Sequence, residues 1–277
     1  MTKIEGKSGT SYAEFGNKCA PTLLCVHGLG LNKDMWQWQV PALQERYHVV
    51  TYDLNWHGKS AERSGEKPSL SGFVSQALNL LDHLGVERAT WIGFSLGGMI
   101  VRRAAMDHPE RVQRLAILNS AHRRSEEAQA AIEKRVVQAR HEGPSSTVGA
   151  ALERWFSQDY QAAHPEMMSL VREWVTSNNP AWYHHVYEVL ASGVDELVAP
   201  NPPIECPTLV LTAEEDFGNS PDMSRAIASE IQGSELVILP RLRHMALAED
   251  SEAVNSALMG FLSKSDHVLG ETGGAQI

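Results

Sequence analysis

The chain has 277 residues, of which 43% are hydrophobic, so it is long enough to bury a large core. Its formal net charge of −10, from 24 basic and 34 acidic residues, disfavours nucleic acid and anionic membranes as partners. We therefore expect a soluble globular protein with neither a nucleic-acid nor a membrane partner.

The cysteines and the N-terminus indicate a cellular location. Cys19, Cys25 and Cys206 are few, odd in number and without disulfide or metal-binding spacing, which is typical of reduced thiols. The first residues contain no apolar signal-peptide segment, and no apolar run approaches the length of a membrane span. The sequence predicts a cytoplasmic protein.

Short apolar runs alternate with helical patterns along most of the chain. This alternation is typical of a mostly parallel sheet with crossover helices, and so of the α/β class. Strands are expected at residues 22–27, 49–53, 90–94, 115–119, 208–213 and 236–240. Helices are expected between them, at residues 36–46, 71–84, 96–107, 221–231 and 252–262.

The alternation stops near residue 120, and residues 125–192 are helical in pattern throughout. Glycine and proline signals divide this stretch, and we interpret it as a cap of four helices inserted into the sheet domain. The polar, glycine-rich end of the chain predicts a mobile tail. The expected first core part, cap, second core part and tail are residues 1–120, 121–200, 201–263 and 264–277.

The segment Gly93-Phe94-Ser95-Leu96-Gly97 places a serine between two glycines, where an expected strand turns into an expected helix. This is the G-x-S-x-G pattern of a nucleophile elbow. So sharp a turn leaves no room for side chains at Gly93 and Gly97, and holds Ser95 in a strained position. The Leu96 N–H lies at a helix N-terminus, where it can stabilise negative charge. Ser95 is the candidate nucleophile and Leu96 a candidate oxyanion donor.

A serine hydroxyl needs a base to become a good nucleophile, and a base and an acid follow in the order Ser, Asp, His. Asp216 and His244 each lie just beyond the carboxyl end of an expected strand, where a site belongs in an open α/β sheet. We expect His244 to accept the Ser95 proton and Asp216 to orient the imidazole. Glu214 and Glu215 remain alternatives for the acid.

The segment His27-Gly28-Leu29-Gly30 follows an expected strand, and a turn there would direct a backbone N–H at the oxygen of an attacked carbonyl. Leu29 is the candidate for this second oxyanion donor. His27 is expected to be hydrogen-bonded within the turn. His57 is also expected to have a structural role. It lies in a turn in which Gly58 supplies an unusual backbone angle.

Together these residues resemble the α/β-hydrolase fold family, from about residue 22 to residue 262. His27-Gly28 is similar to the family's oxyanion turn, Asp216 to its acid, and His244 with Glu249 to its terminal histidine segment. The resemblance implies a mostly parallel sheet flanked by helices, with an inserted helical cap. Asn55-Trp56 and Arg243 depart from the family pattern, which often has Arg-Gly or Pro-Gly and a glycine there.

The cap and residues 153–157 are most similar to the 3-oxoadipate enol-lactonases and related carboxylesterases. A serine at position 95 argues against haloalkane dehalogenases, which carry aspartate there. The resemblance implies a cofactor-free serine hydrolase that cleaves an ester or enol-lactone of a small molecule through a Ser-His-Asp triad and an acyl-enzyme. Carbon–carbon bond hydrolases, perhydrolases and slow-hydrolysing small-molecule receptors remain alternatives.

The substrate would lie between Ser95 and the cap, so that cap residues set specificity. Aromatic side chains would supply apolar walls, and basic ones could bind a carboxylate. Packing between helices, or solvation of a helix face, is the plain alternative for each of them. His184 and His185 are adjacent on an expected helix and point apart, so no metal site is predicted. The candidates for substrate binding are His122, Arg124, Trp155, Trp182 and His184.

Overall fold

The computed structural model describes residues 3–4, 9–60 and 66–264. The predicted tail, apart from Lys264, lies outside the described residues. Eight strands of the described chain form one sheet in the order β1-β2-β4-β3-β5-β6-β7-β8. The strands are β1 Lys3–Ile4, β2 Ser11–Phe15, β3 Thr22–Val26, β4 His48–Tyr52, β5 Ala89–Phe94, β6 Val112–Leu118, β7 Thr208–Ala213 and β8 Glu235–Leu239.

The six predicted strands correspond to β3 to β8, which are all parallel to one another. The sequence analysis missed β1 and β2, which add an antiparallel edge. Strand β2 alternates small and polar residues with aromatic ones, and so lacks the continuous apolar run that burial on both faces gives β3 and β5.

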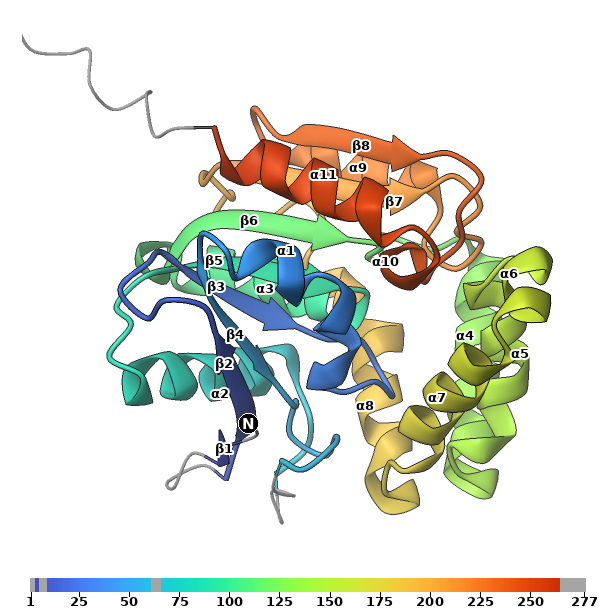
Figure 1. The fold of residues 1–277 in the computed structure, drawn as a ribbon. Helices are drawn as coiled ribbons and strands as arrows, with labels where there is room; N and C mark the ends of the chain where they lie inside the picture. Colours follow the sequence, from blue (N-terminus) through green and yellow to red (C-terminus); the bar gives the residue numbers. More distant parts are fainter. Residues whose placement is uncertain (1–2, 5–8, 61–65, 265–277) are drawn as a thin grey trace, which may run out of the picture.

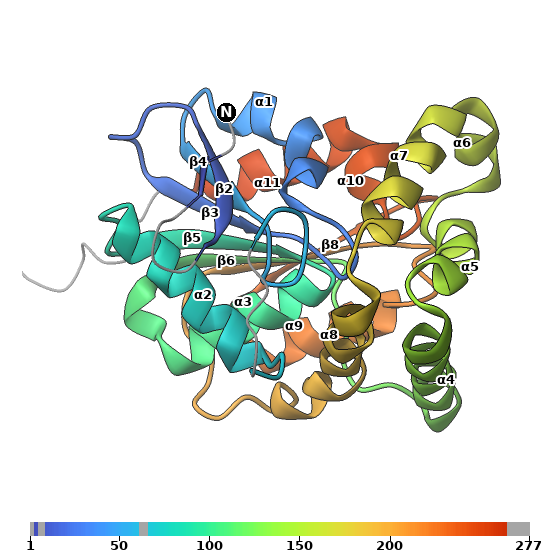
Figure 2. The same ribbon diagram turned by 90° about the horizontal axis from the view of Figure 1, so that it is seen from below.

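Helices cover both faces of the sheet, with α1, α10 and α11 on one side and α2, α3 and α9 on the other (Figure 2). The core helices are α1 Val40–Leu43, α2 Leu70–His83, α3 Leu96–Asp107, α9 Pro221–Glu230, α10 Ala246–Glu249 and α11 Ser251–Leu262. Short 3-10 turns span Lys33–Trp38 (η1), Pro109–Arg111 (η2) and Gly193–Glu196 (η3).

One predicted helix is divided in two. The expected helix over residues 36–46 is the 3-10 turn η1 followed by α1, with the break at Gln39. Pro41 explains the break, because proline lacks an N–H and its ring would clash with the carbonyl of residue 37 in a continuous helix.

The cap has five helices instead of the four predicted. Ser157 ends one segment and caps the next, where its hydroxyl accepts a hydrogen bond from the Tyr160 N–H, and Pro165 then begins another helix. All five lie within the predicted range 121–200. They are α4 Glu126–Glu142, α5 Ser145–Trp155, α6 Gln158–Ala163, α7 Pro165–Thr176 and α8 Pro180–Ser192.

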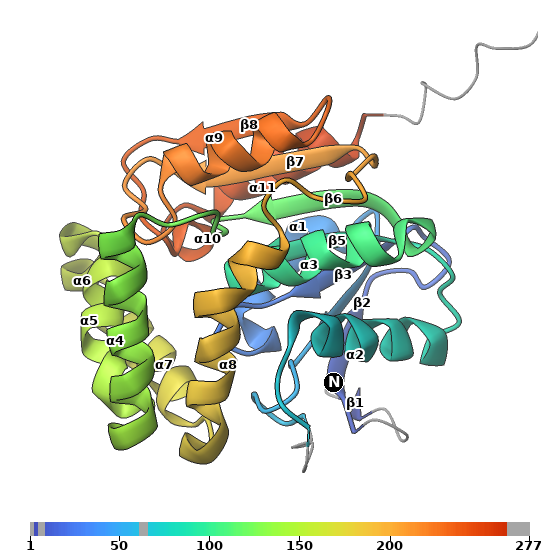
Figure 3. The same cartoon turned by 180° about the vertical axis from the view of Figure 1, so that it is seen from behind.

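The cap lies beyond the carboxyl ends of the strands, with α8 between the other cap helices and the core (Figure 1, Figure 3). Buried Arg102 of α3 ties both connections of the cap to the core. Its guanidinium donates hydrogen bonds to the carbonyl oxygens of Ala121, at 3.0 Å, and Leu197, at 2.8 Å. Within the part of the chain that the structure describes, no helix has the length and apolar character to cross a membrane.

A glycine beside a buried carboxylate yields a test of this packing. Gly58 and Gly85 both have positive φ, at 54° and 69°, but only a Cβ at Gly58 would lie 2.5 Å from the Asp53 carboxyl carbon. Gly85→Ala should lower the free energy of unfolding by about 1 kcal/mol, through backbone strain alone. Gly58→Ala should lower it by about 3 kcal/mol, because it also displaces a hydrogen-bonded carboxylate. Urea unfolding of both variants measures the difference, and equal losses would contradict it.

Candidate active site

Ser95 lies at the turn between β5 and α3, with φ 55° and ψ −114°. A Cβ at Gly93 would lie 2.2 Å from the Gly97 carbonyl oxygen, and one at Gly97 would lie 2.1 Å from the Val26 carbonyl oxygen. The expected lack of room at both glycines is confirmed. The strained conformation follows from this close approach of strand, turn and helix.

Hydrogen bonds on both sides hold the Ser95 backbone in this conformation. Its N–H donates to the Leu118 carbonyl oxygen at 2.9 Å, and its carbonyl oxygen accepts from the Ser120 hydroxyl at 2.9 Å. Both partners belong to the end of β6 and the residues just after it. The neighbouring strand therefore stabilises the elbow.

Asp216 and His244 meet at the ends of β7 and β8. The His244 Nδ1–H donates a hydrogen bond to Asp216 Oδ2 at 2.7 Å, and both side chains are buried. This contact leaves Nε2 without a proton in the neutral imidazole, which is the form that a general base requires. Among the residues described, the Ser95 hydroxyl has no hydrogen-bonding partner, and Ser95 lines the same cavity as His244.

The structure distinguishes the three candidate acids. Glu214 accepts a hydrogen bond from the Arg241 N–H at 3.0 Å, and Glu215 lies 3.6 Å from the Arg243 guanidinium. Both point to basic residues of the loop before His244. Only Asp216 of the three is bonded to the imidazole.

Asn119 is a site residue that the sequence analysis did not identify. Its Nδ2 donates to Asp216 Oδ2 at 3.0 Å, and its own carbonyl oxygen accepts from Asn219 Nδ2 at 2.6 Å. The backbone N–H groups of Gly218 and Asn219 donate to the other carboxylate oxygen. The sequence contained a signal for Asn119, which is a polar residue directly after an apolar strand. Neighbouring strand ends meet at one edge of the sheet, so such a residue lies near the other site residues.

The Leu29 amide is the second candidate oxyanion donor, and the peptide unit that carries it is held by His27. The His27 Nδ1–H donates to the Gly28 carbonyl oxygen at 2.8 Å, and its Nε2 accepts from the Leu54 N–H at 2.9 Å. The predicted structural role of His27 within the turn is confirmed. Neither the Leu29 nor the Leu96 N–H has an acceptor in the described chain, so both are available for a substrate oxygen.

Gly30, the next residue of the turn, is held from both sides. Its N–H donates to His57 Nε2 at 3.1 Å, and its carbonyl oxygen accepts from Asn178 Nδ2 at 2.9 Å. His57 belongs to the core, whereas Asn178 lies between α7 and α8 in the cap. The cap and the core therefore both fix the conformation of the oxyanion turn.

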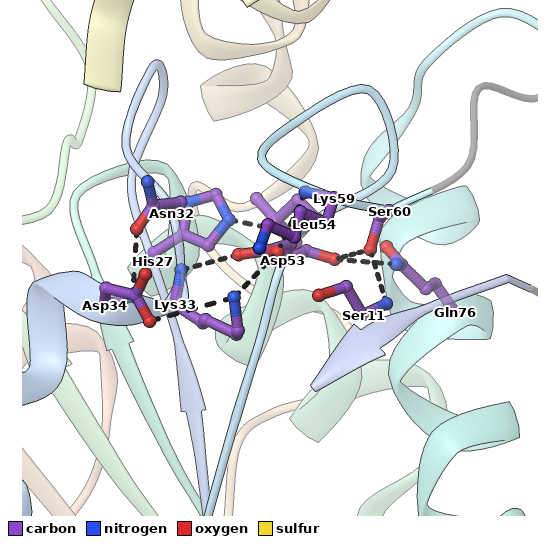
Figure 4. A network of polar contacts seen from close by, with 10 residues as sticks. All are labelled: Ser11, His27, Asn32, Lys33, Asp34, Asp53, Leu54, Lys59, Ser60 and Gln76. Atoms are coloured by element: carbon purple, nitrogen blue, oxygen red, sulfur yellow. Dashed lines mark hydrogen bonds and ion pairs between the residues drawn. The ribbon is translucent and has the colours of Figure 1, made fainter. Parts of the chain in front are cut away.

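A buried ion pair anchors the far end of the turn (Figure 4). The Asp53 carboxylate accepts hydrogen bonds from the Lys33 N–H at 2.8 Å, from Lys33 Nζ at 3.2 Å and from the Lys59 N–H at 3.0 Å. Burial raises the pKa of Asp53, but these N–H groups and His27 outweigh it and hold the pKa below its usual value. The carboxylate is therefore ionised, and removal of the Lys33 ammonium would leave it buried without its paired charge.

A cavity of about 750 Å³, open solvent included, lies between the strand ends and the cap. Of the predicted site residues, those that line it are Leu29, Ser95, Arg124, Trp155, Asp216 and His244. The Trp155 and His244 ring centroids are 5.8 Å apart, so the tryptophan covers the imidazole.

Three predicted substrate-binding residues do not line this cavity. His122 is hydrogen-bonded to Glu230 through Nε2 at 3.0 Å, and Trp182 packs on Trp56 with ring centroids 5.8 Å apart. His184 donates from Nδ1 to the Pro180 carbonyl oxygen in its own helix at 3.4 Å. Spacing along a helix could not decide which face of the cap meets the cavity.

The cavity is also lined by side chains that are not among the five candidates for substrate binding, including Arg135, Arg154, Tyr183 and Tyr187. Arg135 was detectable, because it shares one face of α4 with buried Ile132, Val136 and Ala139. An arginine on the apolar face of a helix is unusual unless it meets a partner or a cavity.

The residues that depart from the family pattern make specific contacts in the structure. The Arg243 guanidinium donates to the carbonyl oxygens of Glu153 and Phe156 at the end of α5, so it joins the histidine loop to the cap. Trp56, at φ 66°, packs edge-on against Phe73 of α2. In the residues that the structure describes, no three His, Cys, Asp or Glu side chains are grouped to hold a metal ion.

Comparison with known proteins decides the family. The sequence profile of the alpha/beta hydrolase fold matches residues 21–251 of this chain. The chain belongs to the α/β-hydrolase fold family. Hydrolases of this family therefore provide the comparison for its chemistry.

Three members illustrate the likeness. The (E)-2-((N-methylformamido)methylene)succinate hydrolase of Acinetobacter baylyi is 28% identical over 87% of this chain and 89% of its own length. The 3-oxoadipate enol-lactonase 2 of the same organism is 28% identical over 92% of this chain and 93% of its own. The enol-lactonase structure from Burkholderia xenovorans has a TM-score of 0.86 and 28% identity, with 95% and 100% coverage of the two chains.

Two of the buried histidines of this α/β-hydrolase, His27 and His57, predict an acid-sensitive fold. Burial lowers the pKa of His27 to about 4 and that of His57 to about 3, whereas both titrate near 6.5 when unfolded. Between pH 6.5 and 4.5 the unfolded state binds protons that the folded state does not, so stability falls as the pH falls. Each histidine should contribute a loss of about 2 kcal/mol over this window, measurable by urea unfolding at each pH.

Two variants separate this effect from general acid denaturation. His57→Gln should reduce the loss between pH 6.5 and 4.5 by about 2 kcal/mol. His108→Gln, at a side chain that is 40% exposed, should leave the loss unchanged. An undiminished loss in His57→Gln would contradict the assignment.

Proposed function

We propose that this protein hydrolyses an ester or enol-lactone of a small, carboxylate-bearing molecule, with Ser95, His244 and Asp216 as catalytic residues. The observation that carries the proposal is the buried hydrogen bond between Asp216 and His244, in the same cavity as a serine on a strained elbow. A carboxylate, an imidazole and a serine in this relation form an acyl-transfer site.

In the first step, the Ser95 oxygen attacks the substrate carbonyl carbon while its proton passes to Nε2 of His244. The carbonyl oxygen becomes negative and accepts hydrogen bonds from the Leu29 and Leu96 amides. The carbon–oxygen bond of the ester or lactone then breaks, and the leaving oxygen takes the proton from Nε2. An acyl group remains on Ser95.

In the second step, a water molecule attacks the acyl carbon and gives a proton to His244. The bond between the acyl carbon and the Ser95 oxygen breaks, and the serine takes the proton back. The product is a carboxylic acid, and the enzyme is regenerated. Asp216 holds the imidazole in one tautomer and stabilises its positive charge in both steps.

Two observations support a carboxylate on the substrate. Arg124, Arg135 and Arg154 line the cavity beside the triad, and guanidinium groups bind carboxylates well. The relatives from Acinetobacter baylyi are named for a substituted succinate and for the enol-lactone of 3-oxoadipate.

The nucleophile is tested with Ser95→Ala. Activity on p-nitrophenyl butanoate should fall by at least about 1,000-fold, because the attacking oxygen is removed. Ser75→Ala is the matched control, since this serine lies on exposed α2 surface and its hydroxyl donates to the Ser71 carbonyl oxygen of the same helix. Hydrolysis by Ser95→Ala at the rate of the parent protein would refute the proposal, provided that thermal melting shows the variant to be folded.

The oxyanion turn is tested through its contact with the cap. Asn178→Ala removes the hydrogen bond to the Gly30 carbonyl oxygen and should lower kcat about tenfold, with little change in KM, because the oxyanion forms only in the transition state. Asn255→Ala, whose Nδ2 bonds to the Trp38 carbonyl oxygen outside the cavity, should change neither constant. A change in KM alone would argue against this role.

A further inference from the structure

The three arginines of the cavity come from separate parts of the cap. Arg124 lies just before α4, Arg135 lies within α4, and Arg154 lies near the end of α5. All three are half-buried and line the space that Ser95 and His244 also line. The fold therefore brings three guanidinium groups to one wall of the candidate active site.

Their contacts orient the guanidinium groups without neutralising them. Arg124 donates hydrogen bonds to the carbonyl oxygens of Leu190 and Ala191, both at 3.1 Å, and Arg135 donates from Nε to the Tyr187 hydroxyl at 3.1 Å. In the described part of the chain, none of the three arginines has a carboxylate within ion-pair distance. No direct ion pair therefore neutralises their positive charges.

Several other arginines of the described chain are paired with carboxylates. Helix α4 itself provides the closest comparison, because Arg140 pairs with Glu188 of α8, whereas Arg135 faces the cavity without a carboxylate. The paired arginines include Arg102, Arg103, Arg111, Arg140, Arg225 and Arg243. In the described chain, Arg46, Arg123 and Arg172 also lack a carboxylate partner, but they are exposed, whereas the three arginines of the cavity wall are half-buried.

The electrostatics agree with this description. Burial lowers the pKa of Arg124 to about 10, and the charge of Arg135 lowers it as well. Burial, and to a smaller extent the charge of Arg135, also lower the pKa of Arg154. A guanidinium with a pKa near 10 still carries its charge at pH 7, so the groups repel one another. Asp216 is the one acidic residue among the described lining, and His244 and Asn119 already engage its carboxylate.

The following inference rests on the proposed ester or lactone hydrolysis. We infer that the cavity takes the ester or lactone of a small acid that carries two free carboxylates besides the bond that is cleaved. Two carboxylates neutralise two of the three guanidinium charges, and Arg135, which acts electrostatically on both other arginines, is placed to serve both anions. The third positive charge favours the negative oxygen that forms in the transition state.

A substrate series with one leaving group tests the number of carboxylates. The series consists of p-nitrophenyl monoesters of butanoic acid, glutaric acid and butane-1,2,4-tricarboxylic acid, which carry zero, one and two free carboxylates. We expect kcat/KM to rise at least about tenfold at each step, since each charged hydrogen-bonding pair contributes about 1.5 kcal/mol or more. A rise at the first step only, or none, would overturn the inference.

Variants of α4 test whether Arg135 causes the rise in kcat/KM with the number of carboxylates. In Arg135→Met, the ratio of kcat/KM for the two-carboxylate ester to that for the butanoate ester should fall at least about tenfold. Arg135→Lys keeps the charge and should retain part of the ratio. Arg140→Met is the matched control, because this arginine lies on the exposed part of the same helix, and its ratio should equal that of the parent. An equal fall in the control would overturn the assignment.

A binding measurement separates this inference from the proposed function. Butane-1,2,4-tricarboxylate should raise the Tm of Ser95→Ala more than glutarate does, and glutarate more than butanoate. If Ser95→Ala keeps full esterase activity, the proposed nucleophile is wrong, whereas the order of the Tm shifts still tests the anion site. Equal Tm shifts in a protein whose activity requires Ser95 would overturn the anion site alone.

Discussion

The backbone of Ser95 is held at φ 55°, and the geometry of the candidate active site depends on this one strained residue. The strain persists because Gly93 and Gly97 have no Cβ. A Cβ at Gly93 would lie 2.2 Å from the Gly97 carbonyl oxygen, so glycine is required for β5, the turn and α3 to pack this closely. Two hydrogen bonds to the end of β6 and Ser120 then stabilise the turn. Any relaxation of the elbow would move the hydroxyl and the Leu96 amide together.

The cap contributes to the catalytic geometry as well as to the cavity wall. Asn178 holds the oxyanion turn at Gly30, and the Met245 N–H donates to the Trp155 carbonyl oxygen at 2.9 Å beside His244. Arg243 adds two further hydrogen bonds from the histidine loop to the end of α5. The position of the cap therefore bears on the turn that carries the Leu29 amide and on the loop that carries His244.

The charge of the cavity is opposite to that of the whole chain. The chain has a formal net charge of −10, which repels anions at long range, yet the described lining contains three arginines and one engaged aspartate. Local guanidinium groups dominate at contact distance, because charges within a partly buried cavity are weakly screened, whereas distant surface charges are screened by salt. Overall charge is therefore a poor guide to the charge of this cavity.

The sequence by itself determined the six parallel strands, the elbow and the order Ser95, Asp216, His244, because apolar runs, glycines and strand ends are local patterns. The same local patterns showed that residues 125–192 are helical. The tertiary structure excluded the alternatives Glu214 and Glu215, since all three carboxylates belong to one loop and only the direction of each side chain shows that Asp216 meets His244. It also decided which cap residues face the triad: Arg135 lines the cavity, whereas His122, Trp182 and His184 bond or pack elsewhere. Helical periodicity defines the faces of each cap helix, but which face meets the cavity depends on packing between helices that are distant in sequence.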